Sequence, residues 1–455
     1  MLKPKLETLW DLSETKIRRI YETYPRERGT PVFTVDGQYT SRGWTEWTQG
    51  FFYGWGILQF DSRGSTDLLQ TARVGTVKHM ATHVSHIGVH DHGFNNVSTY
   101  GNLRRLMLEE RIQYNEWELG FYELALKVSG AVQGSRWGLT DDRTGYVYSF
   151  NGPQSLFVDT IRSMRSLVLS HALGHKLMGE GDEQISLLRR AFEHIANTVR
   201  YNIFFGENRD AYDTVPGRVA HESIFNPRDG QFRCSSTQQG YSAFSTWTRG
   251  LAWALTGLSE QLEFLDVVPG TDAQEVREQE SLRELMLSAA CATADFYIDM
   301  TPTDGIPYWD TAAPGLAGLD DYRNLPSDPY NHAEPVDSSA AAIAAQGLLR
   351  LGRLLSTRGD TRGSRYTGAG VVVMNSLLDE PYLSTDHDHQ GLLLHGVYHR
   401  PRAWDHEPGH DGVPRGESVL WGDYHLVEAA LLAQRLADDG PYYTFFGPRD
   451  SLSFE

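Results

Sequence analysis

The segment "DSSAAAIAAQGLLRLGRLL", residues 337–355, indicates the fold most directly, because its first half carries almost only small side chains. Alanine has the highest helix propensity of the amino acids, and the leucines that follow recur at helical spacing. Small side chains also let two helices approach each other closely. We therefore expect a helix here that packs tightly against its neighbours.

Several other segments also show apolar residues at helical spacing, often behind a Ser or Thr that can cap a helix. Gly, Pro and Asn loops join them, and strand-like alternation is confined to two short stretches, 144–150 and 219–225. The expected helices lie within residues 65–84, 98–111, 155–173, 184–199, 245–265, 281–298 and 419–437.

This succession of short helices predicts an all-α fold of stacked helical hairpins. A closed α/α toroid with a cleft at one end is a further inference, which periodicity itself does not show. No Pro/Ser-rich linker divides the chain, so we expect a single domain. The predicted boundaries are an N-terminal extension and first helix over residues 1–40, the helical toroid over 41–440, and a tail over 441–455.

Composition excludes several classes of protein. The net charge of −18 argues against a nucleic-acid partner. No apolar run is long enough to span a membrane, and no secretory leader is recognisable, so we expect a cytoplasmic protein, or a periplasmic one if a leader was removed. Cys234 and Cys291 are too few for a disulfide framework. No oligomer is predicted.

Histidines gather in one part of the chain, where His79 and His83 lie four residues apart on an expected helix. Two such imidazoles can share a zinc ion, but the helix lacks the glutamate of an HExxH motif. Capping or hydrogen-bonding histidines are the simpler interpretation, and we predict no metal and no cofactor. The remaining histidines of this cluster are His86, His90 and His92.

A second histidine tract lies near the C-terminus, in "STDHDHQGLLLHG". We interpret it as a solvated loop. Its histidines are His387, His389 and His395.

The tripeptide His90-Asp91-His92 places a carboxylate between two imidazoles. Loop carboxylates are usually solvated turn residues, and we expect a loop here, before a helix that begins near Ser98. Gly93 would let the backbone turn, and Phe94 would anchor the loop in the core.

Asp159 is a second candidate acid, on a helix expected to begin near residue 155. Apolar and polar residues would then lie on opposite sides of this helix. A surface acid stabilised by the helix dipole is the ordinary interpretation. In an inner helix of a toroid, the polar side would face the cleft. The apolar side comprises Leu156, Phe157, Ile161 and Met164, and the polar side comprises Asp159, Arg162, Ser163 and Ser166.

Arg249 and Trp253 are four residues apart and so share a helix face. A guanidinium beside an indole suits a sugar acid, although a tryptophan that only fills the core is equally consistent with this segment. Carboxylates next to expected helix starts in segments 304–310, 336–345 and 421–429 are explained by capping.

Ordered motifs occur along most of the chain. They are "GFFYG" (50–54), "HDHGF" (90–94), "FVDTIRSM" (157–164), "HESIFNPRDGQF" (221–232), "QGYSAFSTWTRGLAW" (239–253), "DGIPYWD" (304–310), "DSSAAAIAA" (337–345), "LLLHG" (392–396) and "WGDYHLVEA" (421–429). From about residue 45 to residue 435, their order and spacing resemble the unsaturated glucuronyl hydrolases, family 88 of the glycoside hydrolases.

The resemblance implies an (α/α)6 barrel and removal of a 4,5-unsaturated uronic acid from the non-reducing end of lyase-generated oligosaccharides. It implies that Asp159 is the catalytic acid/base and that Asp91 assists at the sugar hydroxyls. The pocket residues that it implies are His90, His221, Gln239, Arg249 and Trp253, with Trp137 as a sugar-stacking residue.

The chain departs from the family on the side of the partner sugar. Ala243 and Phe244 stand where the family often has acidic residues, and segment 140–153 diverges. The sugar beyond the cleaved bond is therefore not assigned.

The implied chemistry is protonation of a vinyl ether by Asp159, followed by addition of water. A free Asp has a pKa near 3.9, so burial and the like charge of Asp91 would have to raise the pKa of Asp159. Arg249 would offset the repulsion between an acidic protein and an anionic sugar. Three alternatives stay open: a hydrolase of saturated glucuronides with two carboxylates, an epimerase or lyase on a similar toroid, and a non-catalytic sugar-binding protein.

Overall fold

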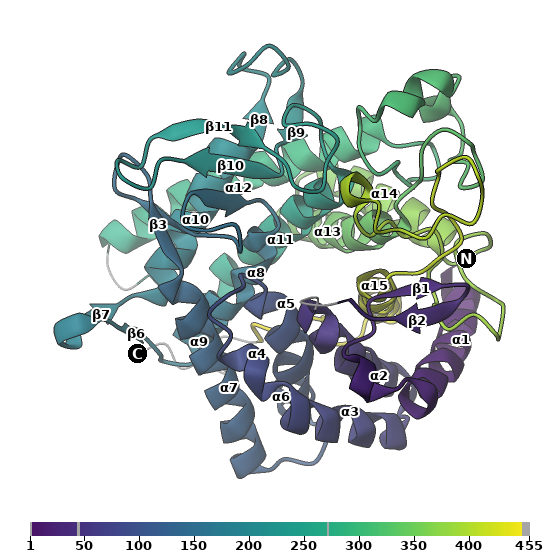
Figure 1. The fold of residues 1–455 in the computed structure, drawn as a ribbon. Coiled ribbons are helices and arrows are strands. Elements are labelled where there is room, and N and C mark those ends of the chain that lie inside the picture. Colours follow the sequence, from purple (N-terminus) through teal and green to yellow (C-terminus); the bar gives the residue numbers. More distant parts are fainter. Residues whose placement is uncertain (1, 43–45, 271–272, 448–455) are drawn as a thin grey trace.

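The computed structural model describes residues 2–42, 46–270 and 273–447, and its helices form two concentric layers (Figure 1). The inner layer consists of α2 (Gln49–Arg63), α5 (His92–Asn96) continued by η3 (Val97–Gly101) and α6 (Asn102–Leu108), α8 (Thr160–Ser163) continued by α9 (Arg165–Ala172), α11 (Thr248–Val267), α13 (Ser338–Thr357) and α15 (Leu420–Ala437). The outer layer consists of α1 (Leu2–Thr23), α3 (Thr66–His79), α7 (Glu116–Ser135), α10 (Leu187–Asn202), α12 (Ala273–Met300) and α14 (Arg362–Leu377).

The inner helices close into a ring. Each packs on the next in chain order, and α15 packs back on α2. Outer and inner helices alternate along the sequence, so each hairpin adds one helix to each layer. Inner helices are buried on nearly all sides, as in α11 and α13, whereas outer helices such as α10 bury one face. The described chain therefore forms an (α/α)6 barrel, and the predicted all-α fold is confirmed.

Short elements connect the helices. They are the helix α4 (Ala81–Val84) and the 3₁₀ turns η1 (Arg26–Arg28), η2 (Glu46–Thr48), η4 (Glu180–Asp182), η5 (Pro314–Gly318), η6 (Tyr322–Asn324) and η7 (Arg400–Arg402). The strands are β1 (Phe33–Val35), β2 (Gln38–Thr40), β3 (Trp137–Leu139), β4 (Gly145–Val147), β5 (Ser155–Phe157), β6 (Leu177–Met178), β7 (Gln184–Ile185), β8 (Ile203–Phe205), β9 (Pro216–Val219), β10 (Glu222–Phe225) and β11 (Phe232–Ser236). Strands were predicted in both 144–150 and 219–225, and both segments contain one.

The small side chains of α13 do what the sequence predicts. Its residues from Ser338 to Gly352 are all buried, and its glycines lie directly against other helices. A methyl group on Gly347 would meet Thr256 of α11 at 2.7–2.9 Å. Any larger side chain at this position would force the two inner helices apart.

The prediction of a helix that begins near residue 155 is partly wrong. Residues 155–157 form β5, which pairs antiparallel with β10, and Asp159 is the residue that precedes α8. Leu156 and Phe157 therefore belong to a buried strand and not to the apolar side of a helix. Helical periodicity cannot reveal a strand whose partner lies more than sixty residues further along the chain.

The prediction of a loop that extends to Ser98 is also wrong, because the helix begins at His92, directly after Asp91. A π-helical turn, η3, interrupts it, and such turns often accompany functional sites. Gly93 has no side chain because a methyl group there would lie 2.4–2.7 Å from the backbone of Ser163. The glycine thus permits the contact between α5 and α8.

Charged residues fill the centre of the barrel below its cleft end. Arg162 of α8 is fully buried, and its Nε and Nη2 atoms lie 3.0 Å from Glu260 of α11 and 2.8 Å from Glu428 of α15. Its Nη2 also donates to Gln346 of α13 at 2.6 Å. One side chain therefore bridges four inner helices.

The N-terminal helix α1 packs on α2, α14 and α15, and Phe445 in the C-terminal segment packs in the core. The boundaries proposed at residues 40 and 440 stay a prediction, and residues 448–455 of the predicted tail lie outside the described residues. None of the helices in the described ranges combines the length and apolar composition needed to cross a bilayer.

Replacing Arg162 by Met should lower the free energy of unfolding by about 3–5 kcal/mol, because Glu260 and Glu428 would stay buried without the guanidinium that contacts them most closely, with Arg165 left as a more distant partner at 3.3 and 3.9 Å. Urea unfolding followed by circular dichroism measures this change. The matched control is Arg189→Met in α10, since Arg189 is 80% exposed and pairs only with Glu193 one turn away. The control should cost at most about 1 kcal/mol. Equal losses in the two variants would contradict a central role for the Arg162 cluster.

Candidate active site

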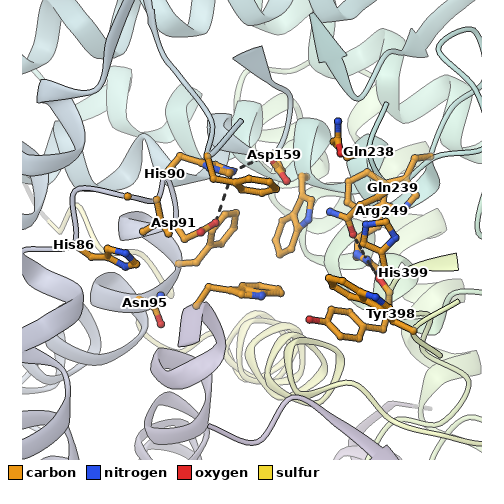
Figure 2. Close-up of a pocket in the computed structure, with 18 of the residues that line it drawn as sticks. His86, His90, Asp91, Asn95, Asp159, Gln238, Gln239, Arg249, Tyr398 and His399 are labelled. Carbon is orange, nitrogen blue, oxygen red and sulfur yellow. Dashed lines mark hydrogen bonds and ion pairs between the residues drawn. The ribbon is translucent and has the colours of Figure 1, made fainter. Parts of the chain in front are cut away.

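A pocket of about 250 Å³ opens at the end of the barrel where the longer connections gather. Figure 2 shows His90 and Asp91 on one side of it, facing Gln239, Arg249, Tyr398 and His399 on the other. The lining residues are Trp47, His83, His86, Gly88, Val89, His90, Asp91, Phe94, Asn95, Phe150, Asp159, Gln238, Gln239, Trp247, Arg249, Trp253, Tyr398, His399, Arg402 and Trp404.

The two predicted catalytic acids line this pocket, with an imidazole between them. His90 Nε2 lies 3.5 Å from Asp159 Oδ1 and 3.8 Å from Asp91 Oδ1. All three side chains are largely buried, and Asp159 Oδ1 makes no hydrogen bond of normal geometry with the protein. With only the longer contact to His90, this oxygen keeps capacity to accept a hydrogen bond from a ligand.

The packing of α5 on α8 sets this geometry. The Gly93 N–H donates to Ser163 Oγ at 2.8 Å, and Arg165 donates to the Gly93 carbonyl at 2.9 Å. Gln133 of α7 donates to the His90 carbonyl at 2.7 Å and to the same Ser163 hydroxyl. The segment that carries His90 and Asp91 is thus tied to the residues that follow Asp159.

The pKa of Asp159 differs from the prediction, and those of its two neighbours are shifted as well. Burial and the charge of Asp159 raise the pKa of Asp91, although His90 opposes this shift. Burial alone would raise the pKa of Asp159, but its interaction with His90 outweighs burial and lowers it. Burial opposes protonation of His90, and the two carboxylates outweigh it and raise its pKa. The predicted rise in the pKa of Asp159 is therefore wrong, because its attraction to the imidazole outweighs both burial and the like charge of Asp91.

His221 lies next to Asp159 because β5 and β10 pair at this point. Its Nδ1 accepts the backbone N–H groups of Gln238 at 3.0 Å and Gln239 at 3.3 Å. Since Nδ1 accepts, the proton of the neutral ring lies on Nε2, which is buried and has no protein partner. Burial lowers the pKa of His221 to about 4, so the ring stays neutral and can donate from Nε2.

Arg249 lies in the pocket wall, but its charge is already paired. Its Nη1 lies 2.8 Å from Asp337 Oδ2, and its Nη2 donates to Gln239 Oε1 at 2.9 Å. The same two nitrogens also bond the carbonyls of Val397 and Tyr398. The predicted role of Arg249 in offsetting the protein's negative charge is thus limited by Asp337, and the side chain holds Gln239 and the 397–398 backbone.

Trp253 lines the pocket as predicted, with its ring 4.8 Å from that of Phe94. Trp137 does not belong to the pocket lining of the described chain. It lies in β3, where Arg190 covers its ring at 4.7 Å and Gly145 contacts its edge. The predicted stacking role of Trp137 therefore finds no support in its position.

Sequence reasoning missed most of the aromatic wall. Several of its members come from connections that carry no helical periodicity, and the one available signal was the density of aromatic residues near the quoted motifs. Arg402 of the same wall is exposed. The missed aromatic and polar residues are Trp47, Asn95, Phe150, Gln238, Trp247, Tyr398, His399 and Trp404.

The carboxylates interpreted as helix caps have mixed outcomes. Asp337 caps α13 through the N–H groups of Ser339 and Ala340, as predicted. Asp423 accepts the N–H groups of Leu392 at 3.0 Å and Leu393 at 2.7 Å, so it fixes a connection and does not cap its own helix. Burial raises its pKa to about 6.

Asp310 likewise fixes a connection, because it accepts the Tyr241 N–H at 2.8 Å and the Ser245 hydroxyl at 2.9 Å. Its pKa is raised to about 6 by burial. The capping interpretation is therefore wrong for Asp310 as well as for Asp423. Both carboxylates instead hold the loops around the pocket.

The N-terminal histidine cluster does not converge on one point in the described chain. His92 bonds Ser129 and the His86 carbonyl through its two ring nitrogens, and His79 stacks on Tyr53. These contacts support the interpretation of hydrogen-bonding histidines.

No protein-family model matches the chain. An unsaturated glucuronyl hydrolase from Bacillus sp. (strain GL1) is 27% identical over 215 residues, which is 47% of this chain and 46% of that protein. An unsaturated chondroitin disaccharide hydrolase from Streptococcus pyogenes serotype M1 is 24% identical over 445 residues, which is 95% of this chain and 92% of that protein. The match thus spans about half the length of the Bacillus protein and nearly all of the Streptococcus protein.

Among solved structures, a complex of UGL with dGlcA-Glc-Rha-Glc has a TM-score of 0.69 and 20% sequence identity. The alignment covers 96% of this chain and 97% of that chain. This likeness concerns the fold and supports the barrel described above. The chain is therefore similar in sequence and in fold to unsaturated glucuronyl hydrolases, and the resemblance predicted from its motifs is confirmed.

Proposed function

We propose that the protein is a glycoside hydrolase that removes a 4,5-unsaturated uronic acid from the non-reducing end of lyase-generated oligosaccharides. The observation that carries this proposal is the position of His90 between Asp91 and Asp159 in a pocket with an aromatic wall. The similarity to hydrolases of this class and to a structure holding a dGlcA saccharide supports it.

The substrate is a vinyl ether, with C4=C5 conjugated to the ring oxygen. Protonation at C4 places positive charge on C5 and on that oxygen. Water then adds at C5, and the resulting hemiketal opens and releases the partner sugar. No enzyme nucleophile attacks the anomeric carbon, in contrast to glycosidases whose two carboxylates flank the scissile bond.

The pKa of His90 is raised and that of Asp159 is lowered, so in the free enzyme we assign the proton that the two groups compete for to His90. Asp159 is then ionised in the free enzyme, beside an imidazolium 3.5 Å from its Oδ1. An anionic sugar that enters the pocket raises the pKa of both groups, and transfer of the proton from His90 is favoured when its carboxylate lies closer to Asp159 than to His90. Asp159 then protonates C4 and afterwards accepts a proton from the attacking water.

Three further groups fit this chemistry. The Nε2–H of His221 is an unpartnered donor beside Asp159, suited to a sugar or water oxygen. Asp91, with its raised pKa, is suited to hold a sugar hydroxyl. Exposed Arg402 in the pocket wall adds positive charge, since that of Arg249 is paired with Asp337.

Asp159→Asn should lower kcat by at least about 10²–10⁴-fold, because the amide can neither donate nor accept the transferred proton. The assay is a panel of lyase-digested polysaccharides, in which loss of ultraviolet absorbance reports consumption of the conjugated double bond. Circular dichroism checks that the variant is folded. Near wild-type turnover by this variant would remove Asp159 from the mechanism.

The same assay separates the rival functions. Release of the aryl group from a saturated aryl glucuronide, with no activity on the unsaturated panel, would favour a two-carboxylate hydrolase. Saccharide binding without turnover, equal in wild type and Asp159→Asn, would favour a non-catalytic protein. A new sugar isomer without cleavage would favour an epimerase.

Activity should fall as pH rises through the raised pKa of His90, because the proton to be transferred is then lost. His90 keeps its proton below its raised pKa and loses it above. The loss of activity therefore forms the alkaline limb of the plot of kcat/KM against pH. His90→Gln should lower kcat/KM and abolish that one-proton limb. His86→Gln, a matched change in the pocket wall, should keep it. An unchanged limb in His90→Gln would contradict the assignment of the proton to His90.

A further inference from the structure

Three side chains with metal-binding atoms converge outside the catalytic pocket, from three separate parts of the chain. Asp36 lies in the turn between β1 and β2, His406 follows η7, and Glu417 precedes α15. One ligand atom from each lies within 4.8 Å of the others, and His406 Nε2 is 3.5 Å from Asp36 Oδ1. Figure 1 shows the β1–β2 hairpin beside the barrel end where α15 lies.

We propose that Asp36, His406 and Glu417 bind a divalent transition-metal ion, with Zn²⁺ as the best fit. One imidazole nitrogen and two carboxylate oxygens match the ligands of zinc, whereas Mg²⁺ and Ca²⁺ prefer oxygen atoms alone. Donor atoms around a tetrahedral zinc ion lie roughly 3.4 Å apart, given metal–ligand distances of about 2.1 Å. Small side-chain rotations would therefore complete the site.

The surroundings of Glu417 match a second layer of metal-site contacts. His389 Nδ1 lies 3.0 Å from the Gly391 nitrogen and 3.3 Å from the Gly391 carbonyl, and when it accepts the closer N–H the ring proton lies on Nε2. This Nε2 is buried, has no hydrogen bond of normal geometry, and faces Glu417 Oε2 at 3.6 Å. A histidine that orients a ligating carboxylate in this way commonly supports a metal site. The Gly37 N–H, 3.3 Å from the same oxygen, adds to this orientation.

Charge also favours a cation at this position. Arg415 is the arginine nearest to Glu417 in the sequence, but its guanidinium donates to Asp411 at 2.6 Å and to the Asn331 carbonyl at 2.8 Å. The carboxylates of Asp36 and Glu417 therefore have imidazoles as their ion-pair partners. A dication would neutralise both carboxylates in a protein whose net charge is −18.

The site would restrain one wall of the catalytic pocket. The neighbouring residue, Asp405, accepts the backbone N–H groups of Tyr398 and His399, which both line that pocket. A metal ion on His406 would thus join the N-terminal hairpin to the 398–406 segment. Loss of the metal ion should raise KM more than it lowers kcat, because none of the three metal-binding residues touches the reacting groups.

The test is Zn²⁺ binding by the full chain, stripped with a chelator and measured by calorimetry and by metal analysis after dialysis. Wild type should retain one equivalent of Zn²⁺ and should bind Mg²⁺ and Ca²⁺ more weakly. His406→Ala and Asp36→Asn should each weaken binding at least about tenfold. Asp36 is 86% exposed, so its replacement leaves the core intact. The matched control, His410→Ala, changes an exposed histidine of the same loop and should bind like wild type.

A second measurement is thermal unfolding. Zn²⁺ should raise the Tm of wild type and of His410→Ala, and should leave the Tm of folded Asp36→Asn nearly unchanged. The proposal would be overturned if wild type retained no zinc. It would also be overturned if wild type, His406→Ala and Asp36→Asn retained equal amounts. Both measurements omit the saccharide, so their outcome is independent of the proposed function.

Discussion

The buried guanidinium of Arg162 is the constraint on which the rest of the structure depends. It bridges Glu260 and Glu428 from two other inner helices, and it follows Asp159 by three residues. A buried charge whose partner is removed costs about 3–5 kcal/mol, so the three helices are held in one arrangement. Because Arg162 is fixed below the pocket, the start of α8, and with it Asp159, is fixed above it. The same side chain therefore contributes both to the stability of the barrel and to the position of Asp159.

Hydrogen bonds from backbone N–H groups to aspartate side chains hold the connections above the barrel. Asp310, Asp337 and Asp423 are buried and Asp405 is half-buried, and each accepts backbone N–H groups from the connections between the helices. Segments with no periodic pattern of their own can in this way be as well placed as helices. The charge on Asp337 serves twice, since it also pairs with Arg249. Pocket shape thus depends on carboxylates that do not themselves line the pocket.

The sequence could predict most of the helices because helical periodicity is a local property, as in α13 with its alanines. Inner helix α2 was not among the predicted helices, and the closed six-hairpin barrel followed from the family resemblance. The positions of Asp91 and Asp159 in one pocket followed from the family resemblance, and the structure brings them together. The strand at Ser155–Phe157 could not be predicted, because it exists through pairing with β10. Nor could the early helix start at His92, which depends on the contact between Gly93 and Ser163.

The position of His90 between two carboxylates also lay beyond sequence reasoning, and it changes the proposed chemistry. If Asp159 held its own proton, a neutral sugar would serve as well as an acid. With the proton on His90, a negative charge that enters the pocket closer to Asp159 than to His90 favours transfer to Asp159. The carboxylate of the proposed substrate would then assist protonation as well as binding. Selectivity for a uronic acid and activation of the catalytic acid would be one electrostatic event.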